Sequence, residues 1–323
     1  MAAERFLVTG SGGCIGAWTT VRLAKEGVDM IALDVSENQR RLQLLLDEAE
    51  LAKVRTITGD IRETEFMVGL VIGEGITHIV HLAGLQVPFC RADPVLGSQV
   101  NVTGTINVLE AVRRSDGAVR GLSFASSVAV FGPAHLYEDG VAFDESPLAP
   151  ATLYGGYKQA NEQSAAMYAA DWGIGSVGLR PCIVYGPGRD QGLTSDVTKA
   201  TLAAASGRDS HIGFGGSSTL QHADDMAATF IAAARLESEV ARVHNVPGPT
   251  APIREIADLL EDAAEVSISV ADEPLPLPSE IDGSPLTDLL GESVQHRPID
   301  DGLTEDIEHF RRLLAEGKLE APA

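Results

Sequence analysis

The sequence predicts an α/β protein built on a doubly wound parallel sheet, with a smaller C-terminal lobe. Short apolar runs alternate with helix-forming stretches over the first 184 residues, which is the pattern of parallel strands joined by crossover helices. A cluster of glycines follows the first apolar run, at the edge where such a sheet binds ligands. The chain of 323 residues is long for one simple core, so an appended lobe is expected.

The first predicted strand, residues 5–9, leads into the turn Gly10-Ser-Gly-Gly-Cys-Ile-Gly16 and then a helix over residues 17–26. In a Rossmann-type dinucleotide fold, Gly10 allows the tight turn, Gly13 lets the backbone approach a pyrophosphate, and Gly16 lets helix and strand pack closely. The spacing differs from the commonest glycine fingerprint, so its place between strand and helix carries the prediction. The cofactor contacts expected in this turn are Gly10, Gly13, Cys14, Ile15 and Gly16.

The second predicted strand, residues 28–33, ends at Asp34. A carboxylate at this position accepts hydrogen bonds from the adenosine ribose and repels a 2′-phosphate, which favours NAD over NADP. Arg40 and Arg41, in the next predicted helix, argue the other way. A helix N-cap is the alternative role for Asp34.

The third and fourth predicted strands, residues 54–58 and 77–82, place further cofactor contacts at the same edge of the sheet. Asp60 and Ile61 follow the third strand, near where an adenine would lie. Small residues after the fourth strand let the backbone pass beneath the cofactor. The contacts expected there are Leu82, Ala83 and Gly84.

Two polar residues near this edge are interpreted differently. His81, in the fourth strand, is expected to be a buried structural histidine. Asn101 lies in a predicted helix over residues 94–114, where an asparagine is a poor helix former. We place Asn101 among the cofactor-site residues and expect it to bond backbone groups in preference to substrate.

The fifth predicted strand, residues 120–125, ends at Ser126 and Ser127. Polar side chains at the carboxyl end of a strand in an open parallel sheet face the ligand crevice. A loop rich in proline, glycine and acids follows over residues 132–150 and is a candidate rim for an active site.

The helix predicted over residues 151–171 carries Tyr154 and Lys158, which lie on one helix face because they are four residues apart. A cation ~4 Å from a phenol, at an effective dielectric constant of ~20, provides about the 4 kcal/mol that ionising the phenol near neutrality requires. Such a pair takes a proton from an alcohol or returns one to a carbonyl. The alternative is a surface tyrosine stacked on a lysine stem.

These motifs occur in one order along the chain: Gly10/Gly13/Gly16, Asp34, Asp60-Ile61, His81-Leu-Ala-Gly84, Asn101-x-x-Gly-Thr, Ser126-Ser127, Tyr154-x-x-x-Lys158 and Arg180-Pro-x-x-Val-Tyr-Gly-Pro187. Through them, over roughly residues 4 to 250, the chain resembles the extended short-chain dehydrogenase/reductases, in particular the NAD-dependent epimerase/dehydratase family. The resemblance implies tightly bound NAD and a hydride taken from a secondary alcohol carbon. It also implies Tyr154 as base, Lys158 bonded to the nicotinamide ribose, and Ser127, with Ser126 beside it, bonding the reacting oxygen.

The resemblance further implies the domain organisation. Residues 1–184 would form the NAD-binding domain, with 212–246 returning to it. Residues 185–211 and 247–323 would form the substrate-binding lobe. Helices 94–114 and 151–171, the latter with Ala165, Ala166, Ala169 and Ala170, would form the interface of a homodimer.

The substrate is predicted from two departures from the family pattern. Nucleotide-sugar enzymes of the family usually carry Asn where this chain has Ile183 and Arg where it has Ser218. Both family residues help to hold the nucleotide diphosphate, so their loss favours a smaller carbohydrate-type substrate, a sugar acid or polyol. The candidate substrate contacts are Gln86, Ser126, Ser127, Arg189 and Gln191; a salt bridge to Asp190 or to another acid is the alternative for Arg189.

The leading hypothesis is therefore an NAD-dependent oxidoreductase or epimerase that acts on a secondary alcohol of a carbohydrate-type substrate. Dehydrogenase and epimerase share the first step, and the sequence does not separate them. A UDP-sugar 4-epimerase is one alternative. A non-catalytic NAD-sensing binding protein is another, against which the presence of Tyr154, Lys158 and Ser127 argues.

Composition narrows the partners to small molecules. A net charge of −22 repels phosphate backbones, so nucleic-acid binding is not expected. No apolar run is long enough for a membrane span, and the predicted N-terminal strand leaves no room for a signal peptide. Three widely spaced cysteines favour a reducing cytoplasmic location over disulfides or a metal site.

Overall fold

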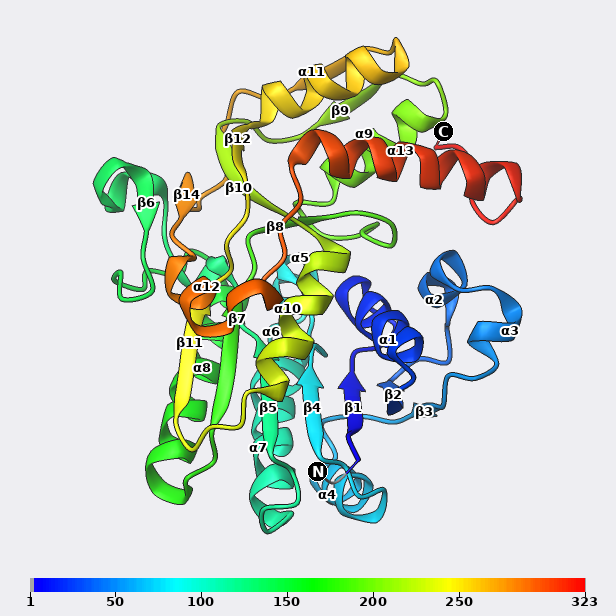
Figure 1. Cartoon of the computed structure of the whole chain (residues 1–323). Coiled ribbons are helices and arrows are strands. Elements are labelled where there is room, and N and C mark those ends of the chain that lie inside the picture. The colour runs from blue at the N-terminus through cyan, green and yellow to red at the C-terminus, as the bar shows by residue number, and fades with distance from the viewer. Residues whose placement is uncertain (1–2, 323) are drawn as a thin grey trace.

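A seven-stranded parallel sheet forms the larger part of the molecule (Figure 1). The computed structural model describes residues 3–322. The strand order is β11-β7-β5-β4-β1-β2-β3, so the chain reverses direction across the sheet between β1 and β4, and the doubly wound parallel sheet is confirmed. Its strands are β1 (Arg5–Thr9), β2 (Asp29–Asp34), β3 (Thr56–Thr58), β4 (His78–His81), β5 (Gly121–Ala125), β7 (Ser176–Arg180) and β11 (Ala241–Asn245).

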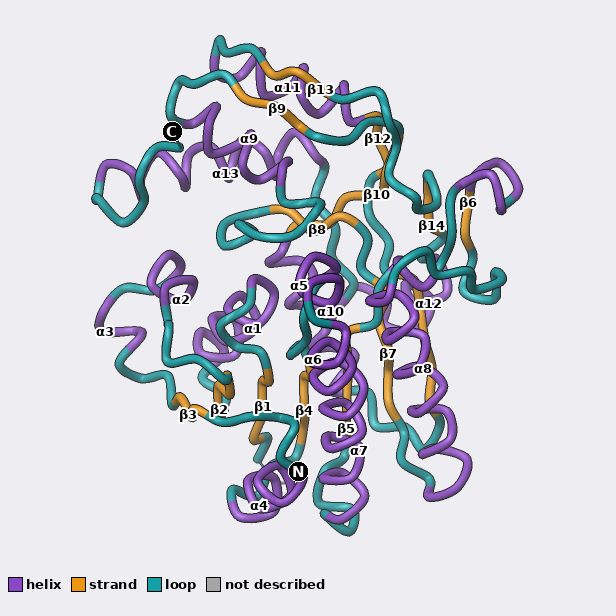
Figure 2. The backbone as a smooth tube through the Cα atoms, turned by 180° about the vertical axis from the view of Figure 1, so that it is seen from behind, coloured by secondary structure: helices purple, strands orange, loops and turns teal. Residues whose placement is uncertain are grey.

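Helices cover both faces of this sheet (Figure 1, Figure 2). Phe6 and Val8 of β1 join the core beneath α1 and α10, whereas Leu7 joins the core on the side of α4 and α7. Successive strand residues point to opposite faces, so strands buried on both faces are apolar throughout. The covering helices are α1 (Cys14–Glu26) and α10 (Ala223–Arg235) on one face, and α4 (Thr64–Gly73), α7 (Gly104–Arg114) and α8 (Leu153–Trp172) on the other.

Two elements predicted as continuous are interrupted. The apolar run over residues 176–184 predicts a single strand, but the structure divides it at Pro181 into β7 and β8 (Ile183–Tyr185), which belong to different sheets. Proline has no N–H for a central ladder, which explains the break. The helix expected over residues 94–114 becomes α6 (Pro94–Ser98), a π-helical turn (Gln99–Thr103) and α7. Further short helices are α2 (Arg40–Leu45), α3 (Glu48–Leu51) and α5 (Val87–Ala92).

The smaller lobe lies beyond the carboxyl ends of the main strands (Figure 1). Its helices share one apolar core with a three-stranded sheet of β8, β10 and β12. Of the segment 212–246, expected to return to the main sheet, α10 and β11 do so, whereas β10 lies in the lobe. The elements not yet given are β6 (Val141–Ala142), α9 (Asp196–Ala205), β9 (Ser210–Ile212), β10 (Ser217–His222), β12 (Thr250–Pro252), α11 (Ile253–Ala264), β13 (Ile268–Val270), β14 (Glu280–Ile281) and α13 (Ile299–Ala315).

The many prolines and acids of residues 272–299 predict a loop, but the segment contains β14 and the helix α12 (Ser284–Leu290). Pro285 stands in the first turn of α12, where a proline is tolerated because its missing N–H has no intrahelical partner. Leu286 is fully buried in the main core. The loop prediction is wrong because proline-rich composition does not reveal this long-range packing. No helix within residues 3–322 combines the length and apolar character that crossing a membrane requires.

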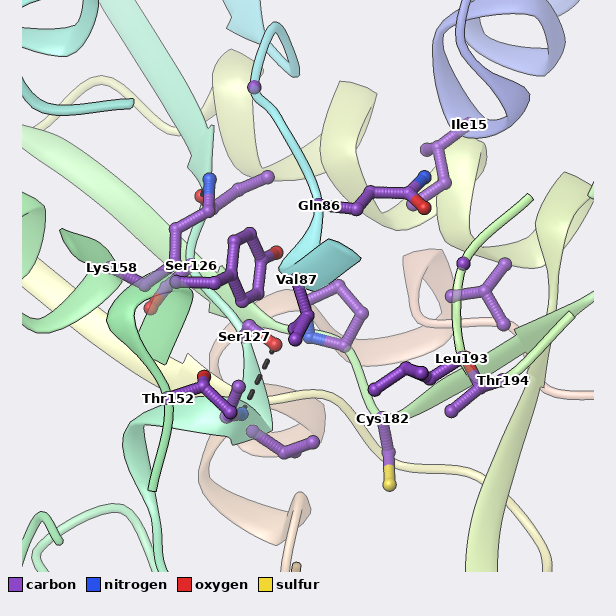
Figure 3. A pocket seen from close by; sticks show the side chains of 18 of the residues that line it. Ile15, Gln86, Val87, Ser126, Ser127, Thr152, Lys158, Cys182, Leu193 and Thr194 are labelled. Atoms are coloured by element: carbon purple, nitrogen blue, oxygen red, sulfur yellow. Dashed lines mark hydrogen bonds between the residues drawn. The ribbon is translucent and has the colours of Figure 1, made fainter. Parts of the chain in front are cut away.

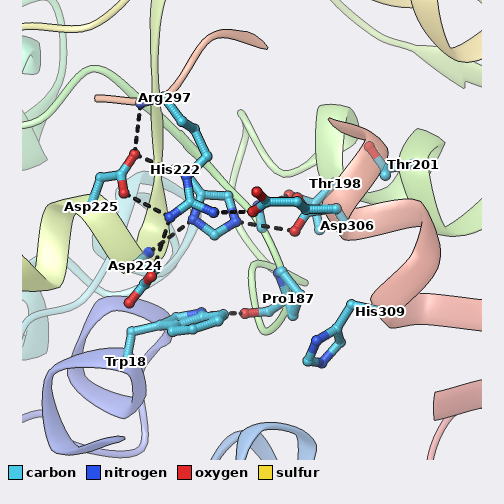
Figure 4. A network of polar contacts seen from close by, with 12 residues as sticks. Trp18, Pro187, Thr198, Thr201, His222, Asp224, Asp225, Arg297, Asp306 and His309 are labelled. Atoms are coloured by element: carbon cyan, nitrogen blue, oxygen red, sulfur yellow. Dashed lines mark hydrogen bonds and ion pairs between the residues drawn. The ribbon is translucent and has the colours of Figure 1, made fainter. Parts of the chain in front are cut away.

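A buried polar network joins the lobe to the sheet domain (Figure 4). His222, at the end of β10, contacts Asp306 of α13 with 3.0 Å between Nε2 and Oδ1, and both side chains are buried. Arg297 pairs with Asp225 in the first turn of α10 at 2.7 Å. These contacts fix α13 and β10 relative to the sheet helices.

A buried ion pair positions α8. Arg180, at the end of β7, donates two hydrogen bonds of 2.8 Å to the Glu162 carboxylate on α8, and both side chains are 5% exposed. The guanidinium also lies 4.9 Å from the centroid of the Phe131 ring. The pair therefore ties α8, which carries Tyr154, to the end of a central strand.

Replacing Glu162 with Ala leaves a buried guanidinium without its counter-ion. We expect Glu162→Ala to lower the free energy of unfolding by about 3–5 kcal/mol, measured by urea denaturation. The double variant Glu162→Met, Arg180→Met removes both charges and should be more stable than the single variant. A loss below about 1 kcal/mol in the single variant would contradict a structural role for the pair.

Candidate active site

Two adjacent cavities lie at the carboxyl edge of the main sheet, at the point where the strand order reverses. The larger cavity, of about 550 Å³, is lined by Asp34 and Asp60. The smaller cavity, of about 260 Å³, is lined by Ser127, Tyr154 and Lys158. The two adjoin each other, because both are lined by Gly10, Gly13, Cys14, Leu82, Gly84, Gln86 and Arg189.

The structure brings most of the predicted site residues to this cleft. Of the predicted cofactor contacts, those that line it are Gly10, Gly13, Cys14, Ile15, Gly16, Asp34, Asp60, Ile61, Leu82, Ala83, Gly84, Tyr154 and Lys158. Of the predicted substrate contacts, Ser126 and Ser127 line the smaller cavity, Gln86 and Arg189 line both, and Gln191 lines only the larger one.

The glycine-rich turn has the geometry that an anionic ligand requires. Gly10 has φ +72°, and a Cβ there would lie 2.6 Å from the backbone nitrogen of Ala83. A Cβ on Gly16 would overlap the Gly10 carbonyl oxygen. No side chain caps the N-terminus of α1, and its first turn carries no acid. Its backbone N–H groups therefore face the cleft without a protein partner that carries negative charge, and they fit a dinucleotide's diphosphate.

Asp34 is fixed at the end of β2 by backbone donors. Its carboxylate accepts hydrogen bonds from Gly12 N at 2.9 Å and Ser36 N at 3.0 Å. The next helix, α2, has Gln39 at its N-cap, so the alternative of Asp34 as a helix cap does not hold. The side chain stands in the larger cavity, as a ribose-binding carboxylate does.

Arg41 links the two sides of the cleft, a role that the sequence did not indicate. Its guanidinium donates to the Gly12 carbonyl at 2.7 Å, to the Gly188 carbonyl at 2.8 Å and to Asp190 at 2.5 Å. It thus joins the glycine-rich turn to the crossover loop, residues 186–195. These bonds occupy each nitrogen of the group, which weakens the argument that Arg41 serves a 2′-phosphate.

Two other predicted residues are held by local contacts. Arg62 binds the Asp60 carboxylate at 2.6 Å and lowers the pKa of Asp60. His81 is buried, with its ring nitrogens 2.7 Å from the Thr9 hydroxyl and 3.0 Å from the Thr105 hydroxyl. Burial lowers the pKa of His81 to about 3, so it stays neutral, as a structural histidine does.

Asn101 does not line the cleft, which corrects its place among the direct cofactor contacts. The side chain is fully buried in the π-helical turn and donates to the Leu85 carbonyl at 3.1 Å and the Gly97 carbonyl at 2.9 Å. A Cβ on Gly84 would lie 2.8 Å from its Oδ1. Asn101 therefore shapes the backbone beneath the cleft.

The candidate catalytic residues Ser127, Tyr154 and Lys158 lie in one cavity, but Lys158 is not placed to stabilise an ionised Tyr154. Lys158 Nζ donates to the Ala125 carbonyl at 2.6 Å and lies 5.6 Å from the centroid of the Tyr154 ring. Burial raises the pKa of Tyr154, and the Ser127 hydroxyl and the Arg189 charge oppose this rise. Burial also lowers the pKa of Lys158 to about 8. The expected lowering of the phenol pKa by Lys158 is thus corrected, because the ammonium faces a backbone carbonyl and the ring.

The paired serines have different environments. Ser127 Oγ accepts a hydrogen bond from Ala129 N at 3.1 Å, which leaves the hydroxyl proton available to an oxygen in the cavity. Ser126 is buried and donates to the Glu162 carboxylate, so its hydroxyl serves the ion pair beneath α8. Ser126 also lines the smaller cavity, so its role as a substrate contact stays a prediction.

The crossover loop leaves Arg189 facing the cleft. Asp190 pairs with Arg41, so the alternative of an Arg189–Asp190 salt bridge does not form. Arg189 instead donates to the Thr194 hydroxyl at 3.0 Å. Ile183 and Ser218, the two departures from the family pattern, are both buried.

Further lining residues come from segments that the sequence did not single out (Figure 3). Most of them are apolar or carry a hydroxyl, and they come from both the sheet domain and the lobe: Val87, Thr152, Cys182, Leu193, Thr194, Leu275, Pro276 and Leu277. The run Leu275-Pro-Leu-Pro278, with two leucines in an otherwise acidic loop, was a signal that could have identified part of this wall.

Comparison with known proteins agrees with this geometry. A family model described as the NAD-dependent epimerase/dehydratase family matches residues 6–246. An uncharacterised 37.6 kDa protein of Escherichia coli O111:H- is 31% identical over 212 residues, which cover 62% of this chain and 61% of that protein. The chain thus spans less than two thirds of the length of this relative.

Other relatives match along nearly their whole length. The UDP-glucose 4-epimerase of Mycolicibacterium smegmatis is 28% identical over 323 residues, covering 95% of this chain and 98% of that enzyme. Among solved structures, the UDP-glucose 4-epimerase of Thermus thermophilus in complex with NAD is similar with a TM-score of 0.78 and 25% identity. The match covers 95% of this chain and 99% of that one.

The lowered pKa of Lys158 can be observed directly, because the chain has only five lysines. Burial disfavours the ammonium form, so Lys158 should lose its proton near pH 8. NMR of side-chain nitrogens in lysine-labelled protein should show one resonance that titrates near this pH. That resonance should be absent in Lys158→Met; a wild-type spectrum in which no resonance titrates near pH 8 would contradict the burial of this amine.

Proposed function

Because the chain belongs to the NAD-dependent epimerase/dehydratase family, we propose that it acts by hydride transfer at a secondary alcohol of a carbohydrate-type substrate. The observation that carries this proposal is that the Tyr154 phenol and the Ser127 hydroxyl meet in a cavity that adjoins the proposed dinucleotide cleft. A sugar acid or polyol suits the loss of the diphosphate-binding Asn and Arg at Ile183 and Ser218.

The cleft fits NAD, the cofactor of this family. The turn Gly10–Gly16 would hold the diphosphate, Asp34 the adenosine ribose, and Lys158 the nicotinamide ribose. NAD, when bound, accepts a hydride from the alcohol carbon or returns it to a carbonyl carbon. The protein's part is to hold the substrate oxygen, to move its proton and to exclude water.

Tyr154 is the proton carrier in this proposal. Its pKa is raised in the structure, so the phenol is protonated and ready to give its proton to a carbonyl oxygen. To take a proton from an alcohol it needs positive charge nearby, and Lys158 and Arg189 are the cations that line this cavity. Ser127 would donate a hydrogen bond to the same substrate oxygen, which stabilises the charge that develops there.

A nucleotide-sugar 4-epimerase is the second candidate. The UDP-glucose 4-epimerase of M. smegmatis, which matches almost end to end, favours it. Both candidates begin with the same oxidation, and they differ in whether the ketone leaves or is reduced on its other face. A non-catalytic NAD-binding protein is disfavoured by the presence of the full Ser127, Tyr154 and Lys158 set in the cavity.

We further propose a homodimer in a reducing cytoplasmic location. Met167 and Trp172 on α8 and Val95 on α6 are each more than half exposed, and they extend along the helices expected at the interface. Ala165 is buried within the monomer, so it is unavailable to a partner. Cys14, Cys90 and Cys182 are all free thiols.

A substrate screen tests the proposal. Sugar acids, polyols and UDP-sugars are incubated with the NAD-loaded protein, while NADH absorbance and epimer formation are followed together. We expect one class to give NADH or epimer. Turnover of UDP-sugars alone would select the second candidate, and no turnover in any class would reject the enzymatic proposal.

Removing the phenolic oxygen should separate binding from chemistry. We expect Tyr154→Phe to bind NAD as wild type does and to lose at least about 10²-fold in turnover, since a positioned acid–base group contributes that much. NADH fluorescence measures the first property and steady-state rates measure the second. Phe143→Leu, at an exposed aromatic outside the cleft, is the control. Unchanged turnover in Tyr154→Phe would remove Tyr154 from the mechanism.

The dimer proposal predicts a particle of twice the chain mass in light scattering. Met167→Asp places a charge in the middle of the proposed apolar contact and should shift the particle to the monomer mass. A wild-type protein that is monomeric at micromolar concentration would contradict the proposal.

A further inference from the structure

Arg189 differs from every other arginine of the described chain. Residues 3–322 contain many arginines paired with Asp or Glu, as expected where acids outnumber basic residues 46 to 24. The arginines without a carboxylate within 4.0 Å in the described residues are exposed, with the single exception of Arg189, which is half-buried. A partly desolvated cation without a counter-ion is costly, so it calls for an explanation.

No carboxylate of the described residues lies within 4.0 Å of the Arg189 guanidinium. Its neighbour Asp190 is drawn away by Arg41. Its side chain donates to the Thr194 hydroxyl at 3.0 Å, and its Nε is buried with no partner among residues 3–322. The guanidinium is therefore held in place by a neutral hydroxyl, and its Nε–H donor has no acceptor within the described residues.

Gln86 stands on the other side of the same space. Its Oε1 is buried and has no partner within the described chain. A Cβ on Gly192 would lie 3.2 Å from the Arg189 guanidinium and would overlap Gln86 Oε1, so both side chains reach the same glycine. Gln86 and Arg189 line both cavities, and Thr194 lines the one that contains Tyr154.

We propose that Arg189, positioned by Thr194 and flanked by Gln86, is an anion subsite that binds a carboxylate or phosphate group of the substrate. This rests on the proposed function and narrows its substrate class to anionic carbohydrates. A neutral polyol supplies no charge to Arg189 and forms none of the charge-assisted hydrogen bonds that an anion forms, so it binds this position more weakly. Sugar acids and nucleotide sugars both satisfy the subsite, the first through a carboxylate and the second through a diphosphate.

The subsite is tested by equilibrium binding, which needs no turnover. Isothermal titration of the NAD-saturated protein compares glucuronate with glucose, and UDP with uridine. Each pair differs chiefly in the anionic group. We expect at least one anion to bind wild type, and its neutral partner to bind at least about tenfold more weakly. Arg189→Gln should lose the anion's affinity by about 10- to 100-fold, the range for charge-assisted hydrogen bonds.

Two further variants control for net charge and for geometry. Arg91→Gln removes the same charge from an exposed arginine outside both cavities and should bind like wild type. Arg189→Lys keeps the charge but lacks the planar guanidinium. Its affinity for the anion should therefore fall between those of wild type and Arg189→Gln. Glucuronate binding would identify a carboxylate substrate, and UDP binding a phosphate-bearing one.

Two results would overturn the subsite. One is an Arg189→Gln variant that weakens NAD binding severalfold while anion affinity is unchanged, which would assign Arg189 to the cofactor. The other is a wild-type protein that binds neither anion, or binds the neutral partners equally well. Failure of the proposed function shows separately, as turnover that survives Tyr154→Phe or is absent with every substrate class.

Discussion

The site depends on how closely the glycine-rich turn approaches the end of β4. A Cβ on Gly10 would lie 2.6 Å from the Ala83 backbone nitrogen, so only glycine allows the two strand ends to meet there. The same turn then carries the N-terminus of α1, bonds Asp34 through Gly12 N and bonds Arg41 through the Gly12 carbonyl. One backbone approach therefore places the groups proposed to hold a diphosphate and a ribose, and it also anchors the crossover loop.

The buried and half-buried cations of this region differ in the partners that compensate their charge, and these partners indicate the role of each cation. Arg180 is compensated by a buried carboxylate, so it serves structure. Arg41 is shared among carbonyls and an acid, so it serves as a connection. Lys158 has only a carbonyl, and burial lowers its pKa to about 8, so its charge is retained near neutrality but with little margin. Added negative charge near Lys158 would favour its ammonium form, which is the electrostatic change that a bound reacting oxygen brings.

Local motifs allowed the sequence to predict the sheet domain well. β1 falls at the predicted residues 5–9, and nearly all the predicted cofactor contacts line the cleft. Most of these contacts follow the end of a strand in the parallel sheet, whereas Tyr154 and Lys158 lie on one face of α8. The failures involve contacts between distant segments. The direction of the Lys158 amine, the bond from Ser126 to Glu162 and the burial of Leu286 depend on tertiary packing that periodicity does not encode. The same holds for Arg41, whose partners lie 29 and 147 residues away.

The crossover loop contributes residues to the walls of both cavities. Gln86 and Arg189 line both cavities. Trp18 Nε1 donates a hydrogen bond to the Pro187 carbonyl and Arg41 Nε to the Gly188 carbonyl, so both side chains hold the loop against the proposed cofactor side of the cleft. A dehydrogenase must exchange its cofactor in every turnover, so this wall would have to open each time or the dinucleotide would have to leave beneath it. An epimerase returns the hydride to the same substrate and has no such requirement. The fastened loop therefore imposes on a dehydrogenase a step that an epimerase avoids, and the rate at which bound nucleotide exchanges, relative to turnover, distinguishes the two reactions on one preparation.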